Sequence, residues 1–306
     1  MEYSIKPASA NQGTLLILGA SSFVGNRLYH SVGMQSAVGT FYKNTKKQMR
    51  YFDSVRMNLN DIIGVSDNFS HAVILLGDTQ PNSCITDIAK SNAVNVESLI
   101  RIIDVLIEKD ITPVFISSQF VFDGAAGEYV EEDAVNPILV YGRQKVHIEE
   151  YLEKHSEKYL VLRLANVYGD SPGDGTLFTS WMDKVFGGAT QITCASDQKF
   201  SPIYIEDVVE AIIATTNNDC IGTYHVAGPQ RYARVELLMM LLSKLEKYIE
   251  LDIAVNTCSI NDFDLPERRP IDVSMKPEKL VRDTGIRLNE PSEICDQMIH
   301  DYLVQR

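Results

Sequence analysis

The feature that most constrains the fold lies near the N-terminus, where a short apolar run leads directly into a glycine-rich turn. Thr14–Leu18 is apolar enough for a strand that is buried on both faces of a sheet. The next seven residues, Gly19-Ala20-Ser21-Ser22-Phe23-Val24-Gly25, are typical of a tight turn that opens a helix. The unpaired amides at the start of such a helix can bind a pyrophosphate. The segment therefore predicts the first strand and helix of a dinucleotide-binding domain.

This turn departs from the usual glycine spacing at one position. The glycines would be expected at 19, 22 and 25, and the middle position is Ser22. A Cβ atom there crowds the approach of a phosphate to the backbone, although the serine hydroxyl can donate a hydrogen bond itself. An ordinary strand–helix turn with two glycines is the alternative. We expect the following residues of the turn to bind a cofactor: Gly19, Ser21, Ser22, Phe23, Val24 and Gly25.

Strand-like and helix-like segments alternate through the first half of the chain. Apolar runs occur at residues 37–42, 72–76, 114–117 and 160–164, and helical patterns occupy residues 85–108 and 141–155. This alternation predicts an α/β fold of the Rossmann type, a doubly wound parallel sheet with helices on both faces. Ligands bind such sheets outside the carboxyl ends of the strands.

The pattern changes after residue 165, where a loop rich in Gly, Pro, Asp and Ser precedes further helices. We expect residues 1–165 to form the dinucleotide-binding domain, joined by a returning segment near residues 200–228. Residues 166–306 then form mainly a smaller C-terminal substrate domain, with the site in the cleft between the two.

Charge and composition exclude several classes of partner. The net charge of −13 argues against binding to nucleic acid or to anionic membrane surfaces. No apolar stretch approaches the roughly 20 residues of a membrane helix, and the polar first dozen residues lack a signal peptide's apolar core. Five scattered cysteines have no metal-ligand spacing and the six histidines do not cluster. We expect a cytoplasmic protein without a catalytic metal.

The second strand indicates which dinucleotide is preferred. NAD-binding chains often end this strand with an acidic residue, whereas here Lys43, Lys46 and Lys47 follow it. Cations there suit a 2′-phosphate, so NADP is the favoured cofactor, with NAD as the alternative. A solvated basic turn without a ligand is the other interpretation. Asn58 occupies a position where many such chains place an aspartate beside the adenine.

Three residues in the middle of the chain suggest chemistry. Tyr141 and Lys145 are four residues apart and share one face of a helix, and Ser118 ends an apolar run upstream. A free phenol has a pKa of about 10, and a nearby cation lowers that value. The phenol could then exchange a proton with a substrate oxygen that Ser118 holds in place. Taken alone, the Tyr-Lys spacing also fits a surface helix with an extended lysine.

Several segments together resemble a known family. They are residues 116–124, 141–145 and 162–169, followed by 203–208, 222–228 and Arg269-Pro270. In this order, over nearly the whole chain, they resemble the extended short-chain dehydrogenase/reductases and especially their dTDP-4-dehydrorhamnose reductase branch.

The resemblance implies roles for individual residues. Ser118 matches the catalytic hydroxyl residue of the family, Tyr141 its proton donor, and Lys145 the residue that holds the nicotinamide ribose. The family also places cofactor-lining residues at positions matched by Gly77, Asp78, Thr79 and Asn95. Arg269 falls where the family has an arginine near the sugar nucleotide, and a surface arginine is the alternative. A homodimer is expected by analogy only.

The departures from the family pattern concern the substrate side. Gln119 and Phe120 replace the usual Asp-Tyr, and Asn166 stands where rhamnose-forming reductases commonly carry Trp. With Ser118 and Arg269, these residues are expected to contact the substrate. The resemblance therefore implies an NADPH-dependent ketoreductase acting on a nucleotide-activated 4-keto-deoxysugar other than 4-dehydrorhamnose.

Two other functions stay open. A sugar-nucleotide epimerase uses the same three residues, whereas a dehydratase would carry Asp-Glu where Gln119 and Phe120 stand. A non-catalytic NADP-binding regulatory subunit, like that of methionine adenosyltransferase, would keep the fold without turnover. Net consumption of NADPH separates the reductase from both.

Overall fold

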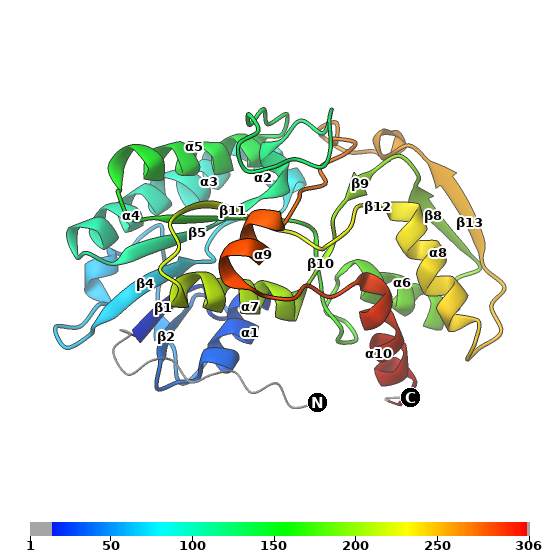
Figure 1. Ribbon diagram of the computed structural model, residues 1–306, viewed down its shortest axis with the longest axis horizontal. Coiled ribbons are helices and arrows are strands. Elements are labelled where there is room, and N and C mark those ends of the chain that lie inside the picture. The colour runs from blue at the N-terminus through cyan, green and yellow to red at the C-terminus, as the bar shows by residue number, and fades with distance from the viewer. Residues whose placement is uncertain (1–13, 305–306) are drawn as a thin grey trace.

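A parallel sheet of seven strands forms the centre of the protein, in the order β11-β6-β5-β4-β1-β2-β3 (Figure 1). The computed structural model describes residues 14–304. The first dozen residues, which we expect not to be a signal peptide, lie outside this range. All pairings between neighbouring strands of the sheet are parallel. The predicted doubly wound parallel sheet is therefore confirmed.

The strands of the central sheet are β1 (Thr14–Leu18), β2 (Ala37–Phe41), β3 (Arg50–Tyr51), β4 (Phe69–Ile74), β5 (Thr112–Ser118), β6 (Leu160–Leu164) and β11 (Gly222–Val226). The α-helices are α1 (Phe23–Val32), α2 (Pro81–Thr86), α3 (Ile88–Asn92), α4 (Ser98–Glu108), α5 (Val140–His155), α6 (Leu177–Phe186), α7 (Ile205–Asn217), α8 (Arg234–Leu245), α9 (Glu278–Thr284) and α10 (Pro291–Val304). Short strands outside the sheet are β7 (Val167–Tyr168), β8 (Gln191–Ala195), β9 (Lys199–Phe200), β10 (Ile203–Tyr204), β12 (Tyr232–Ala233) and β13 (Ala254–Cys258). Short helical turns are η1 (Leu59–Asp61), η2 (Ala93–Glu97), η3 (Gln119–Val121) and η4 (Ile260–Asp262). None of the helices within residues 14–304 is long and apolar enough to span a membrane.

Strand β1 explains why the sheet is covered on both faces. Successive side chains of a strand point to opposite faces. Leu15 and Ile17 accordingly belong to a core shared with α1 and α7, while Leu16 and Leu18 belong to a second core shared with α4 and α5. Residues 15–18 alternate between the two cores, and each of them is apolar for that reason.

The order in which successive strands are added to the sheet reverses at β1. From β1 it proceeds to β2 and β3 on one side, and then crosses to β4, β5 and β6 on the other. In doubly wound sheets this switch point opens a crevice at the carboxyl ends of the two strands where the order reverses. The turn after β1 and the loop after β4 both lie at this crevice, which locates the dinucleotide site.

A third hydrophobic core lies outside the sheet. It is built from α6, α8 and α10 with residues of β7 to β9, and Figure 1 shows these helices at one end of the molecule. Helix α7 and strand β11 instead return to the central sheet, and Leu280 of α9 packs in the core that α1 and α7 share with it. We propose that the third core marks the smaller substrate domain predicted after residue 165.

The expectation of one continuous helix over residues 85–108 is wrong. This stretch contains the end of α2, then α3, the π-helical turn η2 and α4. Asp87 leaves helical geometry at φ −137° and its carboxylate caps α3 by accepting the Lys90 N–H at 3.0 Å. Aspartate favours such a cap over a helix interior, so it ends α2.

Candidate active site

The turn after β1 is built for close packing against α1. A Cβ atom at Gly25 would lie 2.3 Å from the carbonyl oxygen of Gly19, so only glycine fits there. Ser22 caps α1 by accepting the Gly25 N–H at 3.2 Å. The serine that interrupts the glycine pattern therefore has a structural role, and its hydroxyl proton can still be donated to a phosphate. The tight turn and the helix start fit a pyrophosphate.

The two residues expected near the adenosine lie at the outer edge of the sheet. Lys43 is exposed just after β2, with its Nζ 5.9 Å from the Tyr42 ring centroid. Asn58 caps η1 by accepting the Asn60 N–H at 2.9 Å. The buried acidic residue that follows β3 is Asp53, whose Oδ1 accepts the Val55 and Arg56 N–H groups at 3.1 and 3.3 Å. Contact between Asn58 and an adenine therefore stays a prediction.

Asn95 ties the loop after β4 to helix α5. Its Oδ1 accepts the Asp78 N–H at 2.7 Å, and its Nδ2 donates to the Asp78 carbonyl at 2.9 Å and to Gln144 Oε1 at 2.8 Å. Because these contacts occupy its amide, we propose that Asn95 shapes the cofactor loop of Gly77-Asp78-Thr79 rather than contacting the cofactor. Gln144 was missed by sequence reasoning, although its position beside Lys145 on a buried helix face was the available signal.

The structure brings Ser118, Tyr141 and Lys145 together. Ser118 ends β5, Tyr141 lies in the first turn of α5, and Lys145 follows one turn later; all three are less than 10% exposed, at 8%, 6% and 6%. The Ser118 hydroxyl lies close enough to the Tyr141 phenol to lower its pKa, against the larger effect of burial. Lys145 donates from Nζ to the Ile116 carbonyl at 2.7 Å and lies 5.5 Å from the Tyr141 ring centroid. The three groups thus form one buried polar cluster.

Glycine at position 142 permits this arrangement. A Cβ atom there would lie 2.1 Å from the carbonyl oxygen of Phe120, which belongs to the turn η3 that follows Ser118. The start of α5 can therefore approach the end of β5 closely enough to place a phenol beside the serine hydroxyl.

The expected lowering of the Tyr141 pKa by Lys145 is wrong for the protein without ligands. Burial raises the pKa of Tyr141, and the hydrogen bond with Ser118 only partly opposes this effect. Burial also lowers the pKa of Lys145 to about 8, against the attraction of Glu149. The pKa of the neighbouring Cys84 thiol rises to about 11 through burial and the charge of Asp78. The site therefore holds a protonated phenol beside a weakly basic amine.

The residues expected on the substrate side are only partly brought together. Gln119 and Phe120 directly follow Ser118, and the Phe120 ring packs edge-on at 6.3 Å from that of Tyr141. The Gln119 Oε1 is buried without a hydrogen-bond partner. Asn166 follows β6, where its carbonyl accepts the Ile203 N–H at 3.0 Å. The guanidinium of Arg269 donates to Asn82 Oδ1 at the start of α2.

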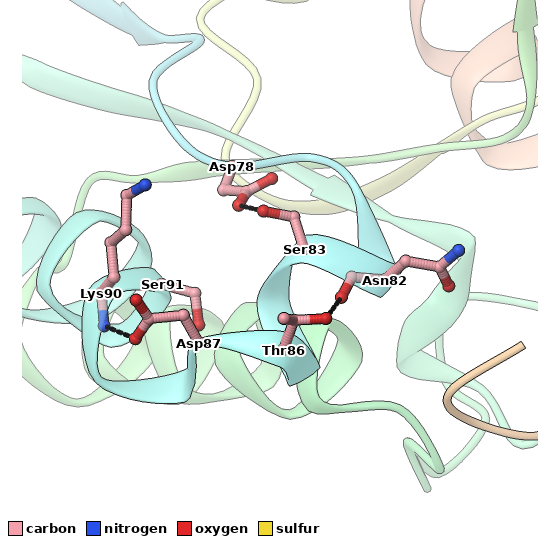
Figure 2. A pocket seen from close by; sticks show the side chains of 7 residues that line it. All are labelled: Asp78, Asn82, Ser83, Thr86, Asp87, Lys90 and Ser91. Carbon is pink, nitrogen blue, oxygen red and sulfur yellow. Dashed lines mark hydrogen bonds between the residues drawn. The ribbon is translucent and has the colours of Figure 1, made fainter.

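A polar cavity of about 340 Å³ lies beside the cofactor loop, between that loop and helices α2 and α3 (Figure 2). Asp78 and Asn82 line it, and the Ser83 hydroxyl donates to the Asp78 carboxylate at 2.5 Å. Asn82 also accepts a hydrogen bond from Arg269, which itself does not line the cavity. Tyr141 and Lys145 do not line it.

Comparison with known proteins agrees with this geometry. The chain is 26% identical over 200 residues to a dTDP-4-dehydrorhamnose reductase of Sinorhizobium fredii, covering 63% of this chain and 67% of the relative. It is 24% identical over 242 residues to methionine adenosyltransferase 2 subunit beta of Xenopus tropicalis, covering 72% and 69%. The crystal structure of a Bacillus anthracis dTDP-4-dehydrorhamnose reductase in complex with NADP superimposes with a TM-score of 0.79 at 18% identity, covering 95% of this chain and 99% of that one.

The chain also matches a protein family over most of its length. Residues 13–304 match the family described as the RmlD substrate binding domain, which includes the whole sheet, the buried Ser118–Tyr141–Lys145 cluster and the third core. The chain therefore belongs to the RmlD substrate binding domain family.

Proposed function

We propose that the protein is an NADPH-dependent ketoreductase that acts on a nucleotide-activated 4-keto-deoxysugar. The observation that carries this proposal is the burial of Ser118, Tyr141 and Lys145 in one cluster, with the Lys145 Nζ 5.5 Å from the Tyr141 ring centroid. This cluster lies at the carboxyl ends of the strands, where doubly wound folds bind their ligands. The relatives named as dTDP-4-dehydrorhamnose reductases support the choice of substrate class.

Each residue of the cluster has a defined task in this reaction. The bound dinucleotide supplies a hydride to the keto carbon. Ser118 donates a hydrogen bond to the keto oxygen and fixes its position against Tyr141. Tyr141 transfers its phenolic proton to the same oxygen as negative charge develops there. The Lys145 ammonium stabilises the resulting phenolate and binds the ribose hydroxyls near the reacting ring.

The electrostatics of the site keep Tyr141 protonated, as the proton donor of a reduction must be. A proton donor must carry its proton when the substrate binds, and burial raises the pKa of Tyr141. The phenol is therefore fully protonated and ready to act as an acid. The cation of Lys145 becomes important once the proton has left, because a buried phenolate without a counter-charge is strongly disfavoured.

The reaction assay must separate three functions. Purified protein is mixed with NADPH and a panel of dTDP-linked 4-keto-deoxysugars, and NADPH oxidation and sugar products are both followed. The reductase proposal predicts consumption of NADPH in step with conversion of the keto sugar to a hydroxyl sugar. Sugar interconversion without net NADPH loss would identify an epimerase. Saturable NADPH binding without turnover of any sugar would favour the regulatory subunit.

The pH dependence follows from Lys145. Its pKa is lowered to about 8 by burial, so the ammonium is present below that pH and is lost as the pH rises through it. We expect kcat/KM to be highest near pH 6–7 and to fall about tenfold for each unit above about pH 8, because only the cation stabilises the phenolate. Initial rates measured at a series of pH values record this fall, which is the alkaline limb of the profile. A flat profile up to pH 10 would show that Lys145 titrates elsewhere or is not needed as a cation.

The basic residue after β2 determines cofactor preference in this account. Lys43→Glu is expected to raise the Kd for NADPH about fivefold and to leave that for NADH nearly unchanged, because an exposed ion pair with the 2′-phosphate contributes about 1 kcal/mol. Fluorescence titration with both nucleotides measures the ratio. Lys247→Glu makes the same charge change at an exposed position just after α8 and should leave both affinities unaltered. Equal losses for NADPH and NADH would refute the assignment of Lys43.

A further inference from the structure

Helix α5 carries a buried carboxylate behind the catalytic cluster. Glu149 follows Lys145 by one helical turn and Tyr141 by two, so the three side chains share one face of the helix. Glu149 is 8% exposed. Buried carboxylates are rare unless they are paired, because a charge loses its hydration on burial. The contacts of Glu149 therefore indicate what it does there.

The carboxylate is fully engaged by two neighbouring strands. The Ser117 hydroxyl, on β5 beside Ser118, donates to Oε1. Arg163 on β6 donates from Nη2 to Oε2 at 2.7 Å and from Nε to both oxygens at 3.2 Å. Arg163 also donates from Nη1 to the His225 Nε2 at 3.4 Å, while the His225 Nδ1–H donates to the Tyr129 carbonyl at 3.1 Å. This places a complete hydrogen-bond network directly behind the site.

Within this network the histidine is neutral. Burial, followed by the charge of Arg163, lowers the pKa of His225 to about 3. Its position between a guanidinium donor and a carbonyl acceptor requires the same tautomer, with the proton on Nδ1. The buried charges are then two cations, Arg163 and Lys145, and one anion, Glu149.

Lys145 depends on that single anion. The groups that face it are Tyr141 and Glu149 from α5, Cys84 from α2 and the Ile116 carbonyl from β5. Tyr141 and Cys84 are both neutral at physiological pH, since burial raises the pKa of each. Only Glu149 offers Lys145 a negative charge among these groups.

We propose that Glu149 is a positioning residue for the reduction: its carboxylate keeps Lys145 charged and fixes α5 against the strand end that carries Ser118. The proposal rests on the function proposed above. It assigns a role in the chemistry to an ion pair that makes no contact with the reacting groups. Without the carboxylate, Arg163 would lose its buried partner, and Lys145 would lose the negative charge that favours its ammonium form, so the ammonium would lose its proton at lower pH.

Glu149→Gln tests this role, because it removes the charge and keeps the size. We expect the alkaline limb of kcat/KM to move to lower pH by about one unit, so that the rate at pH 8 falls about tenfold relative to pH 6. The Kd for NADPH, measured by fluorescence, should show the same shift. Glu150→Gln is the matched control: it makes the same change at the next residue, which is exposed, and should keep the wild-type profile. A purely structural role would lower the rate equally at every pH.

The double variant Glu149→Gln/Arg163→Met keeps the test decisive if the single variant folds poorly. It replaces the whole ion pair and leaves no buried charge without its partner, yet it still removes the negative charge that faces Lys145, so the fall of kcat/KM should stay at the lower pH expected for Glu149→Gln. Glu149→Gln with an unshifted profile in both the rate and the NADPH affinity would overturn the proposal. Wild-type protein that binds NADPH but reduces no keto sugar would instead overturn the proposed function, and the affinity profile would still report on Glu149.

Discussion

Replacement of Tyr141 by phenylalanine is expected to lower kcat about 10³-fold, which is the usual range for removal of a general acid. The ring of Tyr141 packs edge-on against Phe120, and this contact survives the substitution. Only the hydroxyl, which lies close to that of Ser118, is lost. The keto oxygen would keep Ser118 as a hydrogen-bond donor and would lose the phenol that is proposed to transfer its proton.

A matched control separates this effect from general damage to α5. Tyr151 lies on the same helix and donates to Asp104 at 2.5 Å on the outside of the protein. Tyr151→Phe should keep turnover within about twofold, and both variants should bind NADPH as the wild type does. A Tyr141→Phe enzyme that retained more than a tenth of the wild-type kcat would show that another group delivers the proton.

The largest effect on stability is expected from Arg163→Met, which should lower the free energy of unfolding by about 3–5 kcal/mol. Arg163 and Glu149 have side chains only 7% and 9% exposed, and the guanidinium meets the carboxylate at 2.7 Å. Removal of the guanidinium leaves a buried carboxylate with Ser117 as its remaining donor. An uncompensated charge in the interior costs more than the lost contact itself.

Urea denaturation of two further variants shows whether the unpaired charge causes the loss of stability. Glu149→Leu/Arg163→Met removes both ions and should recover most of the lost stability, because apolar residues of similar volume replace a buried ion pair well. Arg287→Met breaks an ion pair with Glu293 whose side chains are 74% and 47% exposed, and it should cost less than about 1 kcal/mol. If the double variant were as unstable as the single one, packing rather than charge would explain the loss.

Much of the fold could be predicted because local sequence patterns determine it. The apolar runs Thr14–Leu18 and Leu160–Leu164 have in the structure the bounds that their patterns predict. In both cases burial and turn signals agree, so no distant contact is needed to define the ends. The same holds for Ser118, Tyr141 and Lys145, whose proximity follows from a strand end and the helix after it in a parallel sheet.

Other features depend on contacts that no local pattern contains. The helix expected over residues 85–108 is interrupted at Asp87, and the turn η2 places Asn95 against Gln144, far along the chain. Two-residue strands such as β7 and β10 exist only through their mutual pairing. The ion pair of Glu149 with Arg163 joins α5 to β6.

The direction of the Tyr141 pKa could not be predicted either. A neighbouring lysine in the sequence suggests a lowered pKa, but the balance depends on how deeply both groups are buried. Here burial dominates and raises the pKa of the phenol. The depth of burial is set by Gly142, Phe120 and the rest of η3, whose approach to α5 is a tertiary contact.

The most direct test of the central claim is a stoichiometric measurement with wild-type protein. A dTDP-linked 4-keto-deoxysugar is supplied in known amount with excess NADPH, and the oxidised cofactor and the reduced sugar are quantified at completion. The proposed mechanism predicts equal amounts of both, with the new hydroxyl at the former keto carbon. Tight binding of NADPH with no oxidation by any keto sugar of the panel would contradict it.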